Sequence, residues 1–330
     1  MGWEAYVKSF VHAVNIAHRA FPGEDDEWTQ GIIRYVDREN GAICNEARSD
    51  SWFLEFLYGP GCLSQLCRSL VRLPSISALY SRRYYHPVSR EQLLQFIEEW
   101  GIAADEAEKP IHTYETINDF FYRRLKPGLR PVEQDPARLV SPADAKVFIF
   151  PQLEGHSMPV KGKRYSLAAL LADAELARRF ENGHVAVFRL APEDYHRFHF
   201  PADGEAGNPL KIPGALDSVS PYALRWDPQV YCFNQRELVP LQSDKFGTIL
   251  LLAVGAMFVG TIVQTFTPGR VRKGAEQGYF CFGGSALVMV LEKGRVVFDR
   301  DLIANSHAGL ETKVKTGTGI GTCVERINRR

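Results

Sequence analysis

Short apolar runs separated by turn residues dominate the chain from about residue 140 onward. The clearest are VFIFP, HVAVFRLA, TILLLAVG, YFCFGG, ALVMVL and RVVFD. Runs of this length, rich in β-branched and aromatic residues, predict strands. Helical patterning in this part thins out to SLAALLADAELARRF (166–180). We therefore expect residues 111–330 to form a β-rich core of mainly antiparallel sheets.

The first 110 residues have a different sequence pattern, which is typical of helices. WFLEFLYGPGCLSQLCRSLVRL (52–73) places large apolar residues at helical spacing around a Gly-Pro-Gly break. SREQLLQFIEEWGI (89–102) has a predicted N-cap at Ser89 and a stop at Gly101. The predicted fold class is α+β, with a helical N-terminal region over 1–110. These helices either pack on the core or rest one face on a bilayer or substrate.

Composition narrows the function classes. The 330 residues hold 39 Lys plus Arg and 39 Asp plus Glu, so no net charge points to nucleic acid. The 6 cysteines lack CxxC spacing, which indicates reduced thiols and argues against a zinc ribbon. The N-terminus has no signal-peptide pattern. We expect a cytoplasmic protein, or one attached peripherally to the cytoplasmic side of a membrane.

One uncharged segment, FGTILLLAVGAMFVGTIV (246–263), has about the length of a minimal membrane span. Its β-branched residues and the breaks at Gly255 and Gly260 favour two buried strands over a spanning helix.

The stretch GYFCFGGSALVMVLEKG (278–294) reads as two strands interrupted by Gly283 and Gly284, with Ser285 directly after the break. Glycine within a strand pattern marks a bulge or a close approach of the backbone. The interruption therefore makes Ser285 a candidate reactive residue.

Two further segments carry reactive groups. Asp144 lies in SPADAKV (141–147), and His196 and His199 lie in DYHRFHFPADGE (194–205). With Ser285 they supply a carboxylate, an imidazole and a hydroxyl, as a nucleophilic triad requires. The two histidines have no third ligand at recognisable spacing, so we expect no metal.

Three readings of these groups remain open. A serine hydrolase fits poorly, because its nucleophile elbow needs a helix after the serine and a strand is predicted here. A non-catalytic binding domain would use Gly-Gly-Ser as a turn and the histidines as core residues. In the third reading, Ser285 attacks the carbonyl of Gly284, an N-to-O acyl shift that the small glycine permits. Elimination of the ester and loss of ammonia would leave a pyruvoyl group at position 285.

The chain resembles the phosphatidylserine decarboxylase family of pyruvoyl-dependent, self-processing proenzymes over roughly residues 60 to 320. Similar blocks occur in family order: YETINDFFYRRLKPGLRPV, SPADAKV, VKGKRYSLAALL, RLAPEDYHRFHFPADGE, IPGALDSVSPYAL, FGTILLLAVGAMFVGTI, KGAEQGYFCFGGSALV and NSHAGLETKV.

The resemblance implies roles for the candidate residues. Asp144 and His199 would activate Ser285 for cleavage after Gly284, and His196 would serve decarboxylation, although the two histidines could exchange roles. The products would be a β chain (1–284) and an associated α chain (285–330) with a pyruvoyl group derived from Ser285. That group replaces pyridoxal phosphate, and no metal is implied.

The implied reaction converts phosphatidylserine to phosphatidylethanolamine and CO2 through a Schiff base. Some relatives instead decarboxylate a free amino acid such as L-tryptophan, and the sequence leaves both substrates open. Two positions depart from the usual pattern, since Ala286 follows the serine and Ala145 follows the SPAD motif. An oligomer remains open, and no nucleic-acid partner is expected.

Overall fold

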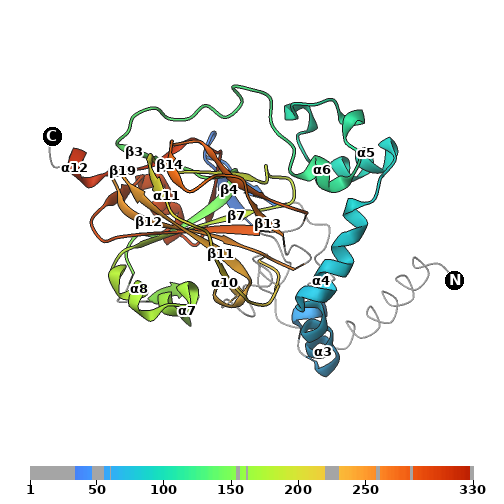
Figure 1. Ribbon diagram of the computed structural model, residues 1–330, viewed down its shortest axis with the longest axis horizontal. Helices are drawn as coiled ribbons and strands as arrows, with labels where there is room; N and C mark the ends of the chain where they lie inside the picture. Colours follow the sequence, from blue (N-terminus) through green and yellow to red (C-terminus); the bar gives the residue numbers. More distant parts are fainter. Residues whose placement is uncertain are drawn as a thin grey trace.

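One large sheet runs through the molecule (Figure 1). The computed structural model describes residues 34–46, 56–59, 61–153, 157–160, 163–219, 230–257, 261–282 and 285–327. In spatial order the sheet contains β14 (Gly269–Val271), β9 (Gly204–Ala206), β11 (Arg236–Ser243), β12 (Gly247–Val254), β16 (Ser285–Leu291), β7 (His184–Leu190), β4 (Ala145–Phe150), β18 (Glu311–Val314), β1 (Arg34–Asp37) and β2 (Ile43–Asn45), while β10 (Leu210–Ile212) also pairs with β11. The pairing is antiparallel except between β1 and β18.

The central strands are buried on both faces, and their side chains alternate between two apolar cores. On β16, Leu287, Met289 and Leu291 enter one core, whereas Ala286, Val288 and Val290 enter the other. Strands β4, β7 and β12 alternate in the same way. Successive strand residues point to opposite faces, so an unbroken apolar run is what a doubly covered strand requires. The predicted strands of the core are confirmed.

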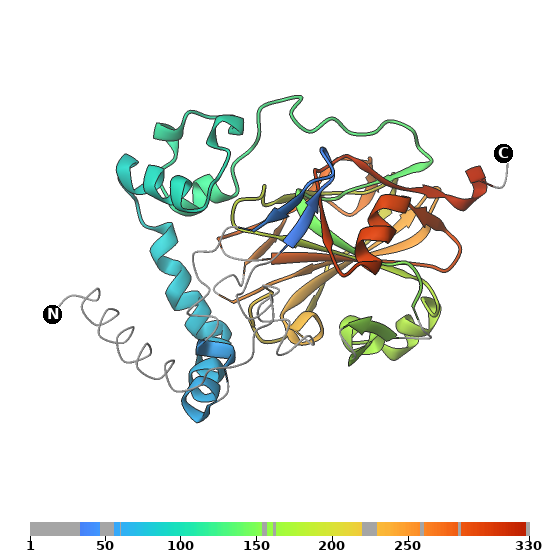
Figure 2. The same cartoon turned by 180° about the vertical axis from the view of Figure 1, so that it is seen from behind.

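Different layers cover the two faces. Helices α7 (Leu167–Leu171), α8 (Ala174–Arg179) and α10 (Val230–Phe233) cover one face, below the sheet in Figure 1. The other face carries α11 (Arg300–His307), seen in front in Figure 2, and two small sheets, β13 (Ile262–Gln264)–β15 (Glu276–Phe280)–β8 (Arg197–His199) and β17 (Val296–Phe298)–β19 (Gly319–Cys323)–β3 (Arg138–Val140). A ribbon of β5 (Ser157–Val160) and β6 (Lys163–Ser166), and the short α12 (Val324–Ile327), complete the core.

A helical segment lies beside the core (Figure 1). It comprises α3 (Cys62–Val71), α4 (Pro74–Ser81), η1 (Arg82–Tyr85), α5 (Arg90–Glu99), η2 (Ala104–Glu106), η3 (Ile111–Thr113) and α6 (Ile117–Phe121). Helix α5 begins as predicted, because Ser89 and Gln92 form a capping box. Gly101, just past its end, has the positive φ of 61° that favours glycine. The helix and strand contents confirm the α+β class.

The expectation of helix throughout residues 1–110 is wrong for residues 34–45. Strands β1 and β2 form a hairpin there, and β1 pairs in parallel with β18, placing Tyr35 opposite Glu311. The turn uses Gly41 at φ 72°, and Arg38 forms ion pairs with Asp299 and Asp301. Partners more than 260 residues away in sequence therefore determine this local structure.

The uncharged segment 246–263 contains strand, as interpreted. Its first part is β12, and β13 begins at Ile262, while 258–260 fall outside the described residues. Within the described ranges, none of the helices is both long and apolar enough to cross a bilayer.

Candidate active site

Several strand ends meet at one edge of the large sheet. Strand β16 begins at Ser285, which pairs with Leu190 at the end of β7. Next in the sheet, β4 begins at Ala145, which pairs with Val314 at the end of β18. Because neighbouring strands lie about 4.8 Å apart, the starts of β16 and β4 are separated by roughly 10 Å. Ser285 begins β16 and Asp144 directly precedes β4 at this edge, while His196 lies in the loop between β7 and β8 and His199 ends β8.

Ser285 is fully buried as the first residue of β16. By the alternation of that strand, its side chain lies on the same face as Leu287, the face covered by β8 and β15. Its Oγ has no hydrogen-bond partner in the described structure. The predicted cleavage partner Gly284 lies, with Gly283, outside the described residues.

His196 is completely buried in the loop between β7 and β8. Its Nδ1 lies 2.9 Å from the carbonyl oxygen of Asp194, so we assign the ring proton to Nδ1. Its Nε2 has no partner among the described residues, and the ring packs on Phe121 at 3.9 Å between centroids. Burial lowers the pKa of His196 to about 3, so the imidazole is neutral at physiological pH.

His199 ends β8, and its main-chain N–H donates to the carbonyl of Pro142 at 2.8 Å. This contact brings the histidine beside the SPAD segment. Its ring lies over Tyr195, and its Nδ1 has no partner in the described residues. Burial lowers the pKa of His199, while the carboxylates of Glu276 and Asp144 act in the opposite direction.

Asp144 immediately precedes β4, and its carboxylate is bound by Arg130 and by a main-chain N–H. Arg130 donates to it from Nε and Nη2, at 2.6 Å for the shortest contact, and the main-chain N–H of Thr316 donates at 2.8 Å. The structure thus brings Asp144 and His199 together through the backbone contact at Pro142, without a hydrogen bond between the two side chains.

The chain just before the glycines is held by the helical segment. The main-chain N–H of Phe282 donates to Oδ1 of Asn118 on α6 at 2.7 Å. The Phe282 ring packs against Tyr84, Phe96 and Phe121 at 3.8, 5.5 and 4.9 Å between centroids. No role was predicted for Asn118, although a buried amide within the short segment TINDFF would need a hydrogen-bond partner.

Buried polar atoms without partners gather around this edge. Native proteins satisfy nearly all such atoms, so a cluster of exceptions indicates a site prepared for a reaction or a ligand. Within the described residues the set includes Asn118 Nδ2, Arg123 Nε and Nη1, His196 Nε2, His199 Nδ1, Ser285 Oγ and Thr316 Oγ1. No group of three or more metal-ligating side chains occurs in the same part of the chain.

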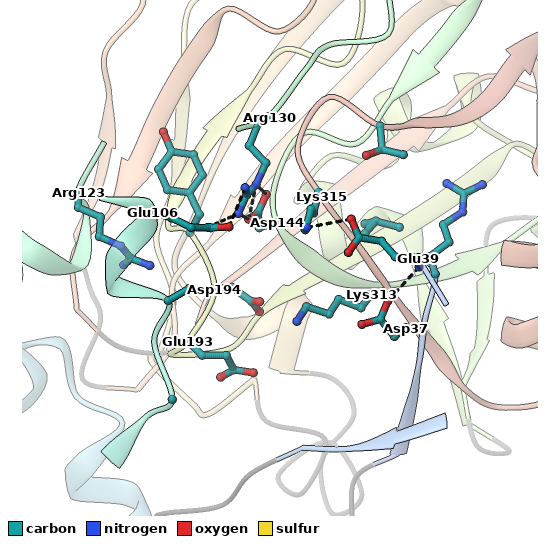
Figure 3. Close-up of a pocket in the computed structure, with 16 residues that line it drawn as sticks. Asp37, Glu39, Glu106, Arg123, Arg130, Asp144, Glu193, Asp194, Lys313 and Lys315 are labelled. Carbon is teal, nitrogen blue, oxygen red and sulfur yellow. Dashed lines mark hydrogen bonds and ion pairs between the residues drawn. The ribbon is translucent and has the colours of Figure 1, made fainter. Parts of the chain in front are cut away.

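A charged cavity of about 460 Å³ adjoins Asp144 (Figure 3). Both Arg123 and Arg130 line it, together with Glu106, Glu193 and Asp194. Arg130 binds Glu106 as well as Asp144. Asp194 accepts from the buried Lys146, and burial raises the pKa of its carboxyl. Ser285 does not line this cavity, which lies beyond β7 at the β4 and β18 side of the edge.

Comparison with known proteins places this geometry in a family. The family described as phosphatidylserine decarboxylase matches residues 117–322, which include all four predicted site residues. The chain belongs to the phosphatidylserine decarboxylase family. It is thereby a carboxy-lyase, as the resemblance in the sequence predicted.

Curated relatives in this family match over most of their length, and each is named phosphatidylserine decarboxylase proenzyme. The protein from Fusobacterium nucleatum is 40% identical over 291 residues, which cover 88% of this chain and 97% of the relative. The Chlamydia muridarum protein is 41% identical over 293 residues, covering 87% and 96%. The Clostridium novyi protein is 38% identical over 293 residues, covering 88% and 99%.

The two departures from the usual family pattern are compatible with the fold. Ala145 starts β4 and does not adopt a positive φ, so its backbone does not require glycine. Ala286 is fully buried in the apolar core that also contains Val254 and Val288. Its methyl group therefore fills space in that core.

Proposed function

We propose that this chain cleaves itself between Gly284 and Ser285 and then converts phosphatidylserine to phosphatidylethanolamine and CO2. The observation that carries the proposal is the buried hydroxyl of Ser285, which has no hydrogen-bond partner among the described residues and begins a strand at the edge where the candidate acid and bases meet. A buried hydroxyl without a hydrogen bond lowers the stability of the fold, so a serine at this position supports a chemical role.

The cleavage step follows from the groups present. Oγ of Ser285 attacks the Gly284 carbonyl carbon, the C–N bond breaks, and an ester replaces the amide. Removal of the Cα proton of residue 285 then breaks the bond between Cβ and Oγ, leaving a carboxylate on Gly284 and dehydroalanine at position 285. Tautomerisation to an imine and addition of water release ammonia and leave a ketone.

We assign His199 as the base that takes the Ser285 hydroxyl proton. Its low pKa keeps it neutral and able to accept the proton, and the Asp144 carboxylate stabilises the imidazolium that forms. Arg130 and the Thr316 N–H hold that carboxylate in place. Asp144 therefore acts on His199 through its charge, while Arg130 and Thr316 hold its carboxylate in position.

The residues fit a pyruvoyl group at position 285, because the serine that would form it lies in a buried site with no competing partner for its Oγ in the described structure. That group supplies an electron sink for decarboxylation of an amine substrate. We assign His196 to this stage, since its neutral Nε2 can hold or transfer a proton. Phe121 covers its ring and keeps water away.

The helical segment supplies a surface suited to a lipid substrate. Leu63, Leu66, Leu70, Leu73 and Leu79 expose between 44% and 62% of their surface along α3 and α4, and we call them the leucine stripe. Spacings of three and four residues place such side chains on one helical face. Arg68 on α3 and Arg72 directly after it bind Asp217 of the core instead. We propose that the leucine stripe rests on the membrane.

Intact mass measured under denaturing conditions tests the central proposal, with Ser285→Ala as the comparison. The wild type should give two pieces separated between Gly284 and Ser285, and Ser285→Ala should give one chain of 37.2 kDa. The processed protein should release CO2 from phosphatidylserine vesicles and not from L-tryptophan. A wild type that stays whole under all conditions would refute the self-processing mechanism.

A further inference from the structure

Arg123 is a buried cation without a counter-ion in the described structure. The residue is 3% exposed, yet its Nε and Nη1 have no hydrogen-bond partner there. Its guanidinium lies over the Phe120 ring at 4.9 Å, a contact that leaves the N–H donors free. A buried charge without a partner is costly, so this arrangement favours a ligand that is absent from the free protein.

Two of the three arginines that line the cavity differ in their partners. Arg130 binds both Glu106 and Asp144, whereas Arg123 binds neither. Glu193 and Asp194, which also line the cavity, are bound by Lys146. Figure 3 shows Arg123 on the side of the cavity away from Lys313 and Lys315. The carboxylates of Glu106, Asp144, Glu193 and Asp194 therefore already bind other cations. Arg123 remains available for an incoming anion.

The position of Arg123 relates it to the reacting centre. It lies two residues after Phe121, the last residue of α6, whose ring packs on His196 and on Phe282. Its positive charge also acts on the buried His196 ring. An anion bound by Arg123 would thus lie at the cavity, close enough for its charge to act on the imidazole assigned to decarboxylation.

The substrate of the proposed function offers two anionic groups, a carboxylate and a phosphodiester. A cation on the carboxylate would stabilise the charge that decarboxylation removes, and so would favour the ground state over the transition state. The phosphodiester keeps its charge throughout the reaction, so a cation there contributes binding without slowing the chemistry. A guanidinium also matches phosphate oxygens with two parallel donors.

We propose that Arg123 binds the phosphodiester of the lipid headgroup and thereby selects phosphatidylserine over free amino acids. This inference rests on the proposed function and deepens it by assigning a specificity residue. Free serine or tryptophan lacks the phosphate and would leave the guanidinium without a partner.

The test compares Arg123→Gln and Arg123→Lys with Arg124→Gln, which removes the adjacent, exposed arginine. Self-cleavage is first verified by mass, and KM and kcat are then measured with short-chain phosphatidylserine. Loss of a hydrogen bond between charged groups, about 1.5–3 kcal/mol, should raise KM roughly 10–100-fold in Arg123→Gln. We expect kcat to change little, Arg123→Lys to be intermediate, and Arg124→Gln to match the wild type.

Inhibition provides a second readout. Glycerophosphoethanolamine should inhibit the wild type far better than ethanolamine, and Arg123→Gln should lose this difference. A fall in kcat at constant KM would overturn the proposal, because it would indicate that Arg123 acts only in the transition state and does not bind the phosphodiester. If Arg123→Gln does not cleave itself, the KM of Arg123→Lys and the inhibition of the wild type by the two amines still test the proposal. Equal inhibition by glycerophosphoethanolamine and ethanolamine would refute the inference. A wild type inactive on phosphatidylserine would instead refute the proposed function itself.

Discussion

The sheet edge around Ser285 buries polar atoms without partners, whereas helices α3 and α4 expose a row of leucines. Each arrangement opposes the distribution that stabilises a protein in water. At the sheet edge, strands on both sides hold β16 in place, so the fold tolerates the unpaired polar atoms there. On the helices, the unfavourable feature is apolar surface exposed to water. We therefore propose that the reaction takes place at the sheet edge and that the helices contact lipid.

The largest expected effect separates the two histidines of the sheet edge. His199→Gln should slow self-cleavage by roughly 10²–10⁴-fold, the usual contribution of a general base, and leave a full-length chain. His196→Gln should still cleave but lose CO2 release by a similar factor. Intact mass and a CO2 assay measure the two outcomes.

His307→Gln, an exposed histidine on α11, is the matched control and should change neither step. If His196→Gln abolished cleavage while His199→Gln left it intact, the two roles would have to be exchanged.

The next effect concerns the ion pair behind the sheet edge. Arg130→Met leaves the Asp144 carboxylate with its Thr316 contact and no cation. Breaking a buried pair costs about 3–5 kcal/mol, and the partial exposure of Arg130 places the loss toward the lower end. Urea unfolding in the Ser285→Ala precursor measures it, and cleavage should slow in the background with Ser285 intact.

Arg270→Met removes an exposed ion pair to Asp244 and serves as the control, with little expected change in the unfolding midpoint. Equal losses of unfolding free energy in the two variants would show that the Arg130–Asp144 pair stabilises the fold no more than an exposed ion pair.

A third experiment tests the helical side of the comparison. Replacing Leu66 and Leu70 by Glu places two charges in the leucine stripe. Because a buried leucine contributes about 1.5–3 kcal/mol, vesicle affinity should fall at least 10-fold. Co-sedimentation with anionic vesicles measures it, while turnover of a short-chain soluble substrate should persist.

Leu210→Glu is the matched substitution, since Leu210 is 56% exposed on β10 outside the stripe. An equal loss of vesicle binding there would mean that added negative charge alone weakens binding, and the membrane assignment would fail.

The smallest effect is on pH dependence. Burial lowers the pKa of His199, so the neutral form persists below the ordinary value of about 6.5. The self-cleavage rate of the precursor should therefore be flat from pH 8 to about 6.5 and decline at more acidic pH. Glu276→Gln removes a carboxylate that raises this pKa, so the decline should move to still lower pH. A midpoint above 6.5 would contradict the assignment of His199.

The sequence allowed prediction of features that depend on local pattern. Short apolar runs between turn residues predicted the central strands, and an N-cap at Ser89 with a stop at Gly101 predicted α5. The interrupted strand and two polar segments gave Asp144, His196, His199 and Ser285 as candidates, and the family resemblance supplied their expected roles.

What escaped prediction depends on contacts between distant segments. The hairpin at 34–45 has strands of only 4 and 3 residues, and its place in the sheet comes from β18. Asn118 binds the backbone of Phe282 across 164 positions, and no periodicity encodes such a contact. The partner of Asp144 was equally hidden, since the Arg130 segment carries no local signal for it.

The place of β16 in the sheet has a consequence for the state after cleavage. Seven residue pairs join this strand to β7, and six more join it to β12. If the chain is cut before Ser285, as we propose, these ladders would form the interface of a heterodimer whose smaller subunit contributes a central strand. Removing that subunit would expose two strand edges at the middle of the sheet, which disfavours dissociation. The native mass and shape of the protein should therefore not change on cleavage. The protein would change its covalent structure while keeping its fold.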